Sequence, residues 1–145
     1  HGVLELSGRI LPQHRAGWGM TWRWSIVPAD SLEALNRRLV AFARARDWEQ
    51  FHSPKNLAMA LIAECAELVE HFQWLTEEQS YRLAPDKKAD VALELADILI
   101  YLMRCAERLD IDLLEAAHRK IALNEARYPV ERVKGDARRA SEYDD

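Results

Sequence analysis

Cysteine is scarce in this sequence, and its placement excludes two common ways of stabilising a small protein. The 145 residues contain two cysteines, Cys65 and Cys105, and both lie inside apolar runs rather than in a CxxC pair. We therefore expect neither a structural zinc site nor a disulfide scaffold, and we expect a reducing, cytoplasmic location.

Long apolar runs and an excess of positive charge are also missing. No run reaches the roughly 18–20 apolar residues that span a bilayer, and no stretch has the basic start and apolar core of a signal peptide. The 24 acidic residues against 20 basic ones give a net charge of -4, which argues against a nucleic-acid surface driven by bulk positive charge. We expect no membrane partner and no nucleic-acid polymer as a partner.

Strand patterns are lacking as well, apart from a weak VLEL near the start, whereas helical periodicity is abundant. Short connections between long helices predict an all-α, antiparallel four-helix bundle. The expected helices run from Asp30 or Ser31 to about Arg46, from Ser53-Pro54 to about Trp74, from Pro85 to about Leu109 and from Asp112 to about Arg127, with a short one from Thr76 to about Leu83.

The two ends of the chain differ from this helical region. We expect a leader at residues 1–28, a helical domain at 29–130 and a polar tail at 131–145, extended or frayed from Val130 onward. The leader opens with His1 rather than Met, so we interpret it as an expression remnant or a flexible arm. The alternative is an arm that packs on a neighbouring subunit through Trp18, Trp22 and Trp24.

Two of the expected helices carry carboxylates where apolar residues are the rule. Glu64 and Glu67 are three residues apart, and so are Glu94 and Asp97, so each pair projects from one helix face. A carboxylate in apolar surroundings needs a proton, a cation or hydrogen bonds. Oxygen ligands without cysteine favour Mg²⁺ or Mn²⁺, which commonly serve phosphate chemistry. The alternative is that these acids pair with Lys and Arg on the bundle surface.

Two other functions stay open on these residues alone. A di-iron carboxylate bundle oxidoreductase needs two ExxH motifs, and only Glu115 with His118 fits that pattern. A non-catalytic helical interaction module with structural acids would show no Mg²⁺-dependent change in melting temperature.

Longer stretches of the sequence resemble a known family. The segments RDWEQFHSPKNLAMALIAECAELVEHFQW, LELADILIYL and KIALNEARYP are similar to the MazG-like all-α nucleoside triphosphate pyrophosphohydrolases, and within them to the dCTP pyrophosphatase branch. The resemblance covers roughly residues 31–135. It implies Mg²⁺-dependent conversion of a (deoxy)nucleoside triphosphate, either dCTP or a modified dCTP, to the monophosphate and pyrophosphate. It also implies a homotetramer, a dimer of dimers whose active sites share residues across subunits.

The same resemblance implies a set of site residues. Metal ligands would be Glu64, Glu67, Glu94 and Asp97, and our hypothesis is that Glu67, or failing that Glu64, polarises the attacking water. The family commonly has a glycine where Cys65-Ala66 stands, and some animal members have a base-contacting histidine where Leu39 stands. The implied substrate-binding residues are Trp48, His52 and Trp74 around base and sugar, Tyr101 as a wall, and Lys120, Asn124, Arg127, Tyr128 and Lys134 near the phosphates and sugar.

Overall fold

In the computed structural model of the chain, residues 31–138 and residue 142 are described. No strand occurs among them, so the predicted all-α fold is confirmed. The leader, with its tryptophans and the VLEL stretch, lies outside these residues. The elements are, in chain order, α1 (Leu32–Arg44), the 3₁₀ turn η1 (Glu49–Phe51), α2 (Pro54–Glu70), α3 (Glu77–Ser80), α4 (Pro85–Arg108), α5 (Leu113–Arg127) and α6 (Val130–Val133).

Local sequence sets where the helices begin. The side chains of Ser31, Ser53 and Asp112 cap α1, α2 and α5, each accepting a hydrogen bond from the backbone N–H three residues on, at 3.1, 3.2 and 2.9 Å. Thr76 and Gln79 form a reciprocal capping box at α3. Each cap satisfies backbone N–H groups that a helix start leaves unpaired. The predicted starts of these four helices are therefore confirmed.

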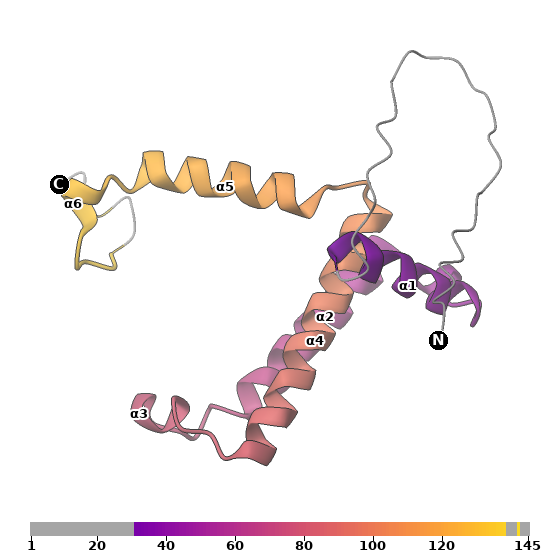
Figure 1. Ribbon diagram of the computed structural model, residues 1–145, viewed down its shortest axis with the longest axis horizontal. Helices are drawn as coiled ribbons and strands as arrows, with labels where there is room; N and C mark the ends of the chain where they lie inside the picture. Colours follow the sequence, from indigo (N-terminus) through magenta and orange to yellow (C-terminus); the bar gives the residue numbers. More distant parts are fainter. Residues whose placement is uncertain (1–30, 139–141, 143–145) are drawn as a thin grey trace, which may run out of the picture.

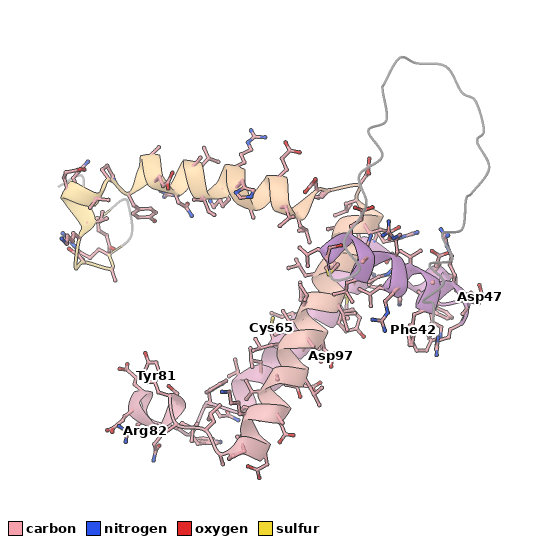
Figure 2. All side chains as sticks on the ribbon, viewed as in Figure 1. Phe42, Asp47, Cys65, Tyr81, Arg82 and Asp97 are labelled. Carbon is pink, nitrogen blue, oxygen red and sulfur yellow. The ribbon has the colours of Figure 1, made fainter. Side chains whose placement is uncertain are left out.

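Helices α2 and α4 lie side by side and form the main packing unit (Figure 1). Leu57 of α2 and Met103 of α4 are buried. Met103 lies near residues of α1, which packs against α4 close to the C-terminal end of that helix (Figure 1). The connection that carries Tyr81 and Arg82 lies at the opposite end of the pair from Phe42 of α1 (Figure 2). Pairing α2 with α4 joins the two helices that carry the unexpected acids.

Helix α5 does not pack along this pair within the described chain. Figure 1 shows α5 extending away from the end of α4. A single chain thus provides three packed helices and a projecting fourth, rather than a bundle closed on itself. Many large apolar side chains stay exposed as a result, which is typical of a subunit interface. They include Met59, Ile62, Val69, Leu93, Leu95, Leu114, Ile121 and Leu123.

Several boundaries differ from those predicted; α3, for instance, ends at Ser80 instead of about Leu83. α2 ends at Glu70 instead of Trp74, because the backbone tightens into a turn over residues 71–74. The expectation of an extended or frayed tail is wrong over Val130–Val133, where Pro129, with its φ fixed at -58°, starts a single helical turn. In the described residues no helix combines the length and apolar character needed to cross a membrane.

Candidate metal centre and adjoining pocket

Three carboxylates from two helices converge between α2 and α4. One oxygen each of Glu64, Glu94 and Asp97 lies within 4.8 Å of the others, and all three side chains are half-buried. Helix α4 contributes two of them because its residues 94 and 97 share a face. Oxygen-only ligand sets of this kind are the ones that Mg²⁺ and Mn²⁺ prefer.

The crowding of negative charge is visible at Glu64. Desolvation raises the pKa of Glu64 above its usual value of 4.5, and the negative charges of Glu67, Asp97 and Glu94 raise it further. Like charges at short range disfavour each other's ionised forms, and a divalent cation among them removes that penalty. The residues present therefore fit a hard divalent cation.

Glu67 lies beside this group of three rather than in it. Its side chain is exposed on α2, but after desolvation its negative charge is the largest contribution to the raised pKa of Glu64. The structure thus brings three of the four predicted ligands together and leaves Glu67 at the edge. The metal-binding role of all four stays a prediction.

A histidine at the end of α2, His71, lies next to Glu94 of the carboxylate cluster. Nε2 of His71 lies 3.7 Å from Oε1 of Glu94, and the two side chains are only 15% and 20% exposed. Nδ1 of His71 is buried and has no hydrogen-bond partner within the described residues. Outer partners of this kind commonly orient metal-binding carboxylates. Spacing puts His71 on the same stripe of α2 as Glu64, but its proximity to Glu94 depends on how α2 and α4 pack.

The ExxH pair lies elsewhere. Glu115 and His118 are on α5, which projects away from the α2–α4 pair, and neither joins the three carboxylates found in the described chain. Within a single chain, the di-iron alternative therefore lacks its predicted histidine ligand.

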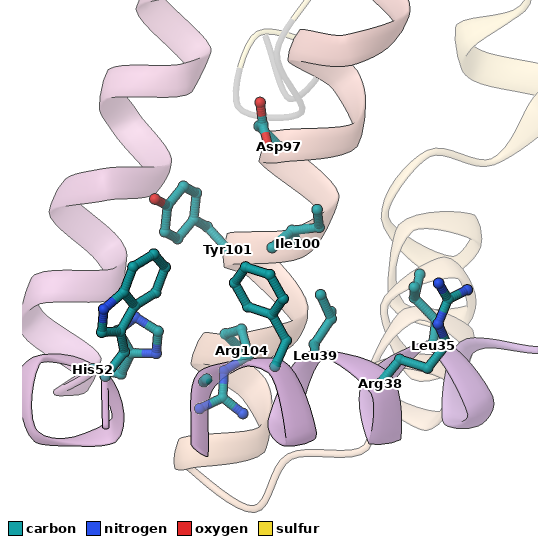
Figure 3. A pocket seen from close by; sticks show the side chains of 11 residues that line it. Leu35, Arg38, Leu39, His52, Asp97, Ile100, Tyr101 and Arg104 are labelled. Atoms are coloured by element: carbon teal, nitrogen blue, oxygen red, sulfur yellow. The ribbon is translucent and has the colours of Figure 1, made fainter. Parts of the chain in front are cut away.

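A pocket of about 550 Å³ opens beside the carboxylates. A volume in this range suits a small organic ligand. Because Asp97 belongs to both the carboxylate group and the pocket wall, a ligand in the pocket would reach the candidate metal centre. The lining residues are Leu35, Arg38, Leu39, Phe42, Ala43, Trp48, His52, Asp97, Ile100, Tyr101 and Arg104 (Figure 3).

Three of the predicted substrate-binding residues, Trp48, His52 and Tyr101, line this pocket. The Trp48 ring meets Phe42 edge-on at a centroid distance of 5.7 Å, and it meets His52 in the same manner at 6.5 Å. Aromatic rings and an imidazole around a cavity are suited to holding a flat ring system.

Burial and neighbouring positive charges keep His52 neutral. Burial lowers the pKa of His52 below its usual value of 6.5, and the positive charges of Arg104 and Arg108 lower it further against the opposing charge of Glu49. At pH 7 the imidazole therefore has one N–H donor and one acceptor nitrogen.

The segment that carries Trp48 is fixed on both sides. Asp47 has a positive φ of 54°, a conformation that Asp tolerates better than most residues. The Trp48 N–H then donates to the last turn of α1 at 3.0 Å. On the other side, Nδ2 of Asn56 donates to the Phe51 carbonyl at 3.0 Å. These bonds set the aromatic wall against α4.

A buried arginine in the pocket was not among the predicted site residues. Arg104 is 2% exposed, and its Nη1 donates to Oε2 of Glu107 at 2.9 Å. Asp97, Tyr101 and Arg104 follow one another at steps of four and three residues on α4. A charged residue continuing that stripe inside an apolar run is a sequence signal that makes Arg104 a candidate, although it does not show that the side chain is buried.

The remaining predicted residues lie away from the pocket in a single chain. Trp74 is 87% exposed in the turn after α2. The others are on or beyond α5, which extends away from the α2–α4 pair (Figure 1): Lys120, Asn124, Arg127, Tyr128 and Lys134. Their substrate-binding roles stay predictions.

Comparisons with known proteins agree with this architecture. The MazG-like family matches residues 60–143. Human dCTP pyrophosphatase 1 is 40% identical over 122 residues, which cover 83% of this chain and 72% of that protein. Mouse dCTP pyrophosphatase 1 is 44% identical over 112 residues, covering 76% and 66%. The crystal structure of a pyrophosphatase from Archaeoglobus fulgidus superposes with a TM-score of 0.65 at 38% identity, covering 68% of this chain and 92% of that one.

Proposed function

Because this chain belongs to the MazG-like family, we propose that it is a divalent-metal-dependent nucleoside triphosphate pyrophosphohydrolase that acts on dCTP or a modified dCTP. It is a hydrolase of acid anhydrides: water attacks the α-phosphorus, and the bond from that atom to the oxygen bridging to the β-phosphorus breaks. The products are the monophosphate and pyrophosphate. The names of the human and mouse relatives and of the Archaeoglobus fulgidus pyrophosphatase support this reaction class.

The main observation in support of this proposal is the position of Asp97, whose carboxylate belongs both to the acidic cluster and to the wall of an aromatic pocket. A nucleoside triphosphate has the matching polarity, with a flat base at one end and a metal-binding phosphate chain at the other. A helical interaction module would need neither a half-buried acidic cluster nor a pocket that ends at it.

Glu64, Glu94 and Asp97 would hold Mg²⁺, for which Mn²⁺ can substitute. When bound, the cation supplies neutralising charge to the phosphates and polarises the reacting centre. Glu67, exposed at the edge of the cluster, accepts the proton of the attacking water. Glu64 is the second choice for that role.

The base and sugar occupy the pocket. Trp48 offers a ring face to the base, Tyr101 walls the side nearer the carboxylates, and neutral His52 offers a donor and an acceptor. Stacking of a base on an aromatic side chain contributes about 1–3 kcal/mol. These contacts hold the nucleoside so that its phosphates reach Asp97.

The chain assembles into a homotetramer, a dimer of dimers, whose sites are completed across copies. The projecting α5 and the exposed apolar side chains of the α2–α4 pair support this assembly. Lys120 and Arg127 of one copy would neutralise phosphate charge at the site of another, with Asn124, Tyr128 and Lys134 close by. Trp74 would join the base pocket in the same way.

The test is a product assay with the full chain, Mg²⁺ and each deoxynucleoside triphosphate in turn. We expect dCTP to yield pyrophosphate and dCMP, and we expect EDTA, Asp97→Asn and Glu67→Gln to abolish turnover. Glu77→Gln, which removes an exposed acid of α3, is the matched control and should be fully active. Release of orthophosphate alone, or turnover that survives both Asp97→Asn and Glu67→Gln, would contradict the proposal.

A further inference from the structure

A buried cation lies at the end of the pocket away from the carboxylates. Arg104 shares the pocket wall with Trp48 and His52, and Figure 3 shows it beyond Tyr101 from Asp97. Asp97 and Arg104 are seven positions apart on α4, which corresponds to a rise of about 10 Å along the helix. One face of α4 therefore carries a carboxylate at one end of the pocket, an aromatic ring in the middle and a guanidinium at the other end.

The guanidinium of Arg104 is anchored on one side only. Its Nη1 donates to Oε2 of Glu107 at 2.9 Å, which fixes the plane of the group. Its Nε and Nη2 are buried and have no hydrogen-bond partner in the described part of the chain. These two nitrogens form one edge of the guanidinium, from which two N–H groups point in parallel. Buried donors without partners are costly and rare, and one reason for keeping them is a ligand that supplies acceptors.

We propose that this free edge of Arg104 selects the base, with Nε–H and Nη2–H donating to N3 and O2 of cytosine. The inference rests on the proposed function and names the residue that sets its base preference. Cytosine presents two adjacent acceptors at N3 and O2. Uracil and thymine present an N3–H donor beside O2, so one donor of Arg104 would face another donor. Arginine binds a pair of adjacent acceptors in the same manner at O6 and N7 of guanine.

The other basic side chains that line the pocket are less suited to this role. Arg38 also lines the pocket, but its side chain is exposed on α1. His52 is neutral and has one donor, so it cannot present two parallel N–H groups. A lysine at position 104 would keep the charge but lose the planar fork. Arg104→Lys therefore separates base selection from a role in charge or packing alone.

The decisive measurement is binding of the monophosphates, which needs no turnover. Titration calorimetry of the full chain in EDTA, at about pH 8 where His52 is neutral, compares dCMP with dUMP. The wild-type chain should prefer dCMP. Arg104→Lys and Arg104→Met should weaken dCMP binding about 10- to 100-fold and bring the two affinities close together. Arg108→Met, which removes an exposed arginine one turn on, should keep the wild-type ratio.

A wild-type chain that does not bind dCMP, or does not prefer it to dUMP, would overturn the inference, as would an Arg104→Lys variant with the wild-type ratio. Circular dichroism checks that each variant is folded. If Arg104→Met does not fold, the binding result for Arg104→Lys alone tests the inference. Rates with dCTP and dUTP separate this idea from the proposed function. If the chain does not hydrolyse dCTP but shows a dCMP preference that depends on Arg104, the proposed reaction is refuted and base selection by Arg104 stands. Hydrolysis with unchanged selectivity in the Arg104 variants refutes only base selection.

Discussion

Carboxylate oxygens of Glu64 on α2 and Asp97 on α4 lie within 4.8 Å of each other. Two ionised carboxylates this close repel one another, and burial strengthens the repulsion. A proton or a cation relieves it. The stability of this chain should therefore depend on divalent metal and on pH through a few identifiable side chains.

Asp97→Asn should change stability in opposite directions with and without Mg²⁺. In EDTA the substitution removes repulsion, so the melting temperature should stay the same or rise. With Mg²⁺ at about 100 times its dissociation constant, the wild-type chain should gain about 2.7 kcal/mol, on the order of 5–10 °C, and the variant should lose most of that gain. Thermal melting in both buffers measures this, with Asp90→Asn, an exposed acid of α4, as the control. A variant that melts lower in EDTA yet keeps the Mg²⁺ gain would contradict the metal site.

Glu64 should make the metal-free chain less stable as pH rises. The pKa of Glu64 is raised in the folded chain, first by desolvation and then by the neighbouring acids, so the unfolded chain releases this proton first. Below the usual value of 4.5 both states hold the proton and Glu64 contributes nothing. As pH rises from 4.5 through the folded pKa, the free energy of unfolding falls. Urea unfolding in EDTA across this range should show a fall that Glu64→Gln reduces; parallel curves for the two proteins would disprove it.

His52 should limit activity at acid pH. Its pKa is lowered by burial and then by Arg104 and Arg108, so the unfolded chain takes up the proton first as pH falls. The stabilising contribution of neutral His52 is present above 6.5 and is lost as pH falls from 6.5 through the folded pKa. Protonation also adds positive charge to the base pocket. Arg108→Met removes one charge that lowers the pKa, so the acid limb of kcat/KM for dCTP should move to higher pH. An unmoved or oppositely moved limb would show that another group controls it.

Trp48→Ala should raise KM for dCTP about 5- to 100-fold, with a smaller effect on kcat, because it removes a stacking surface. Trp48→Phe should retain part of the affinity. Tyr81→Ala is a suitable control, because Tyr81 is 89% exposed at the other end of the α2–α4 pair (Figure 2). Equal KM values for wild type and Trp48→Ala would place the base elsewhere.

Sites shared between copies should allow two impaired variants to restore activity when they are mixed. Glu64→Gln should remove metal binding, and Arg127→Ala should lower kcat/KM about 10- to 100-fold through loss of a charge-assisted contact. Unfolding the two variants together and refolding them as a mixture should produce some sites with Glu64 from one copy and Arg127 from another. Activity of the mixture above the sum of the separate variants supports this arrangement. Refolded wild type controls for yield, and no gain in the mixture would speak against α5 reaching a neighbouring site.

The helices and the acid pairs could be predicted because their signals are local. Ser31, Ser53 and Asp112 cap the helices that follow them, and each cap involves residues three positions apart. The i, i+3 spacing on α4 likewise requires Glu94 and Asp97 to share a face. Adjacent antiparallel helices then bring that face near α2.

Other features depend on contacts that spacing does not encode. The charge of Arg104 within an apolar run is equally typical of a side chain that extends to solvent, and only packing against α1 buries it. The direction of α5 follows from the turn at Asp110, whose φ is 55°. The family resemblance grouped the α5 residues with the substrate site, although within one chain they lie away from the pocket.

The three clustered carboxylates lie within one helical hairpin, since α2 and α4 are joined only by residues 71–84. Closing so short a loop costs little entropy, and contacts between near neighbours in sequence form quickly. During synthesis the hairpin can be complete once Arg108 has left the ribosome, before α5 has emerged from it. The charge repulsion would then arise in the nascent chain, where Mg²⁺ in the cell would act first as an aid to folding and only later as a catalyst.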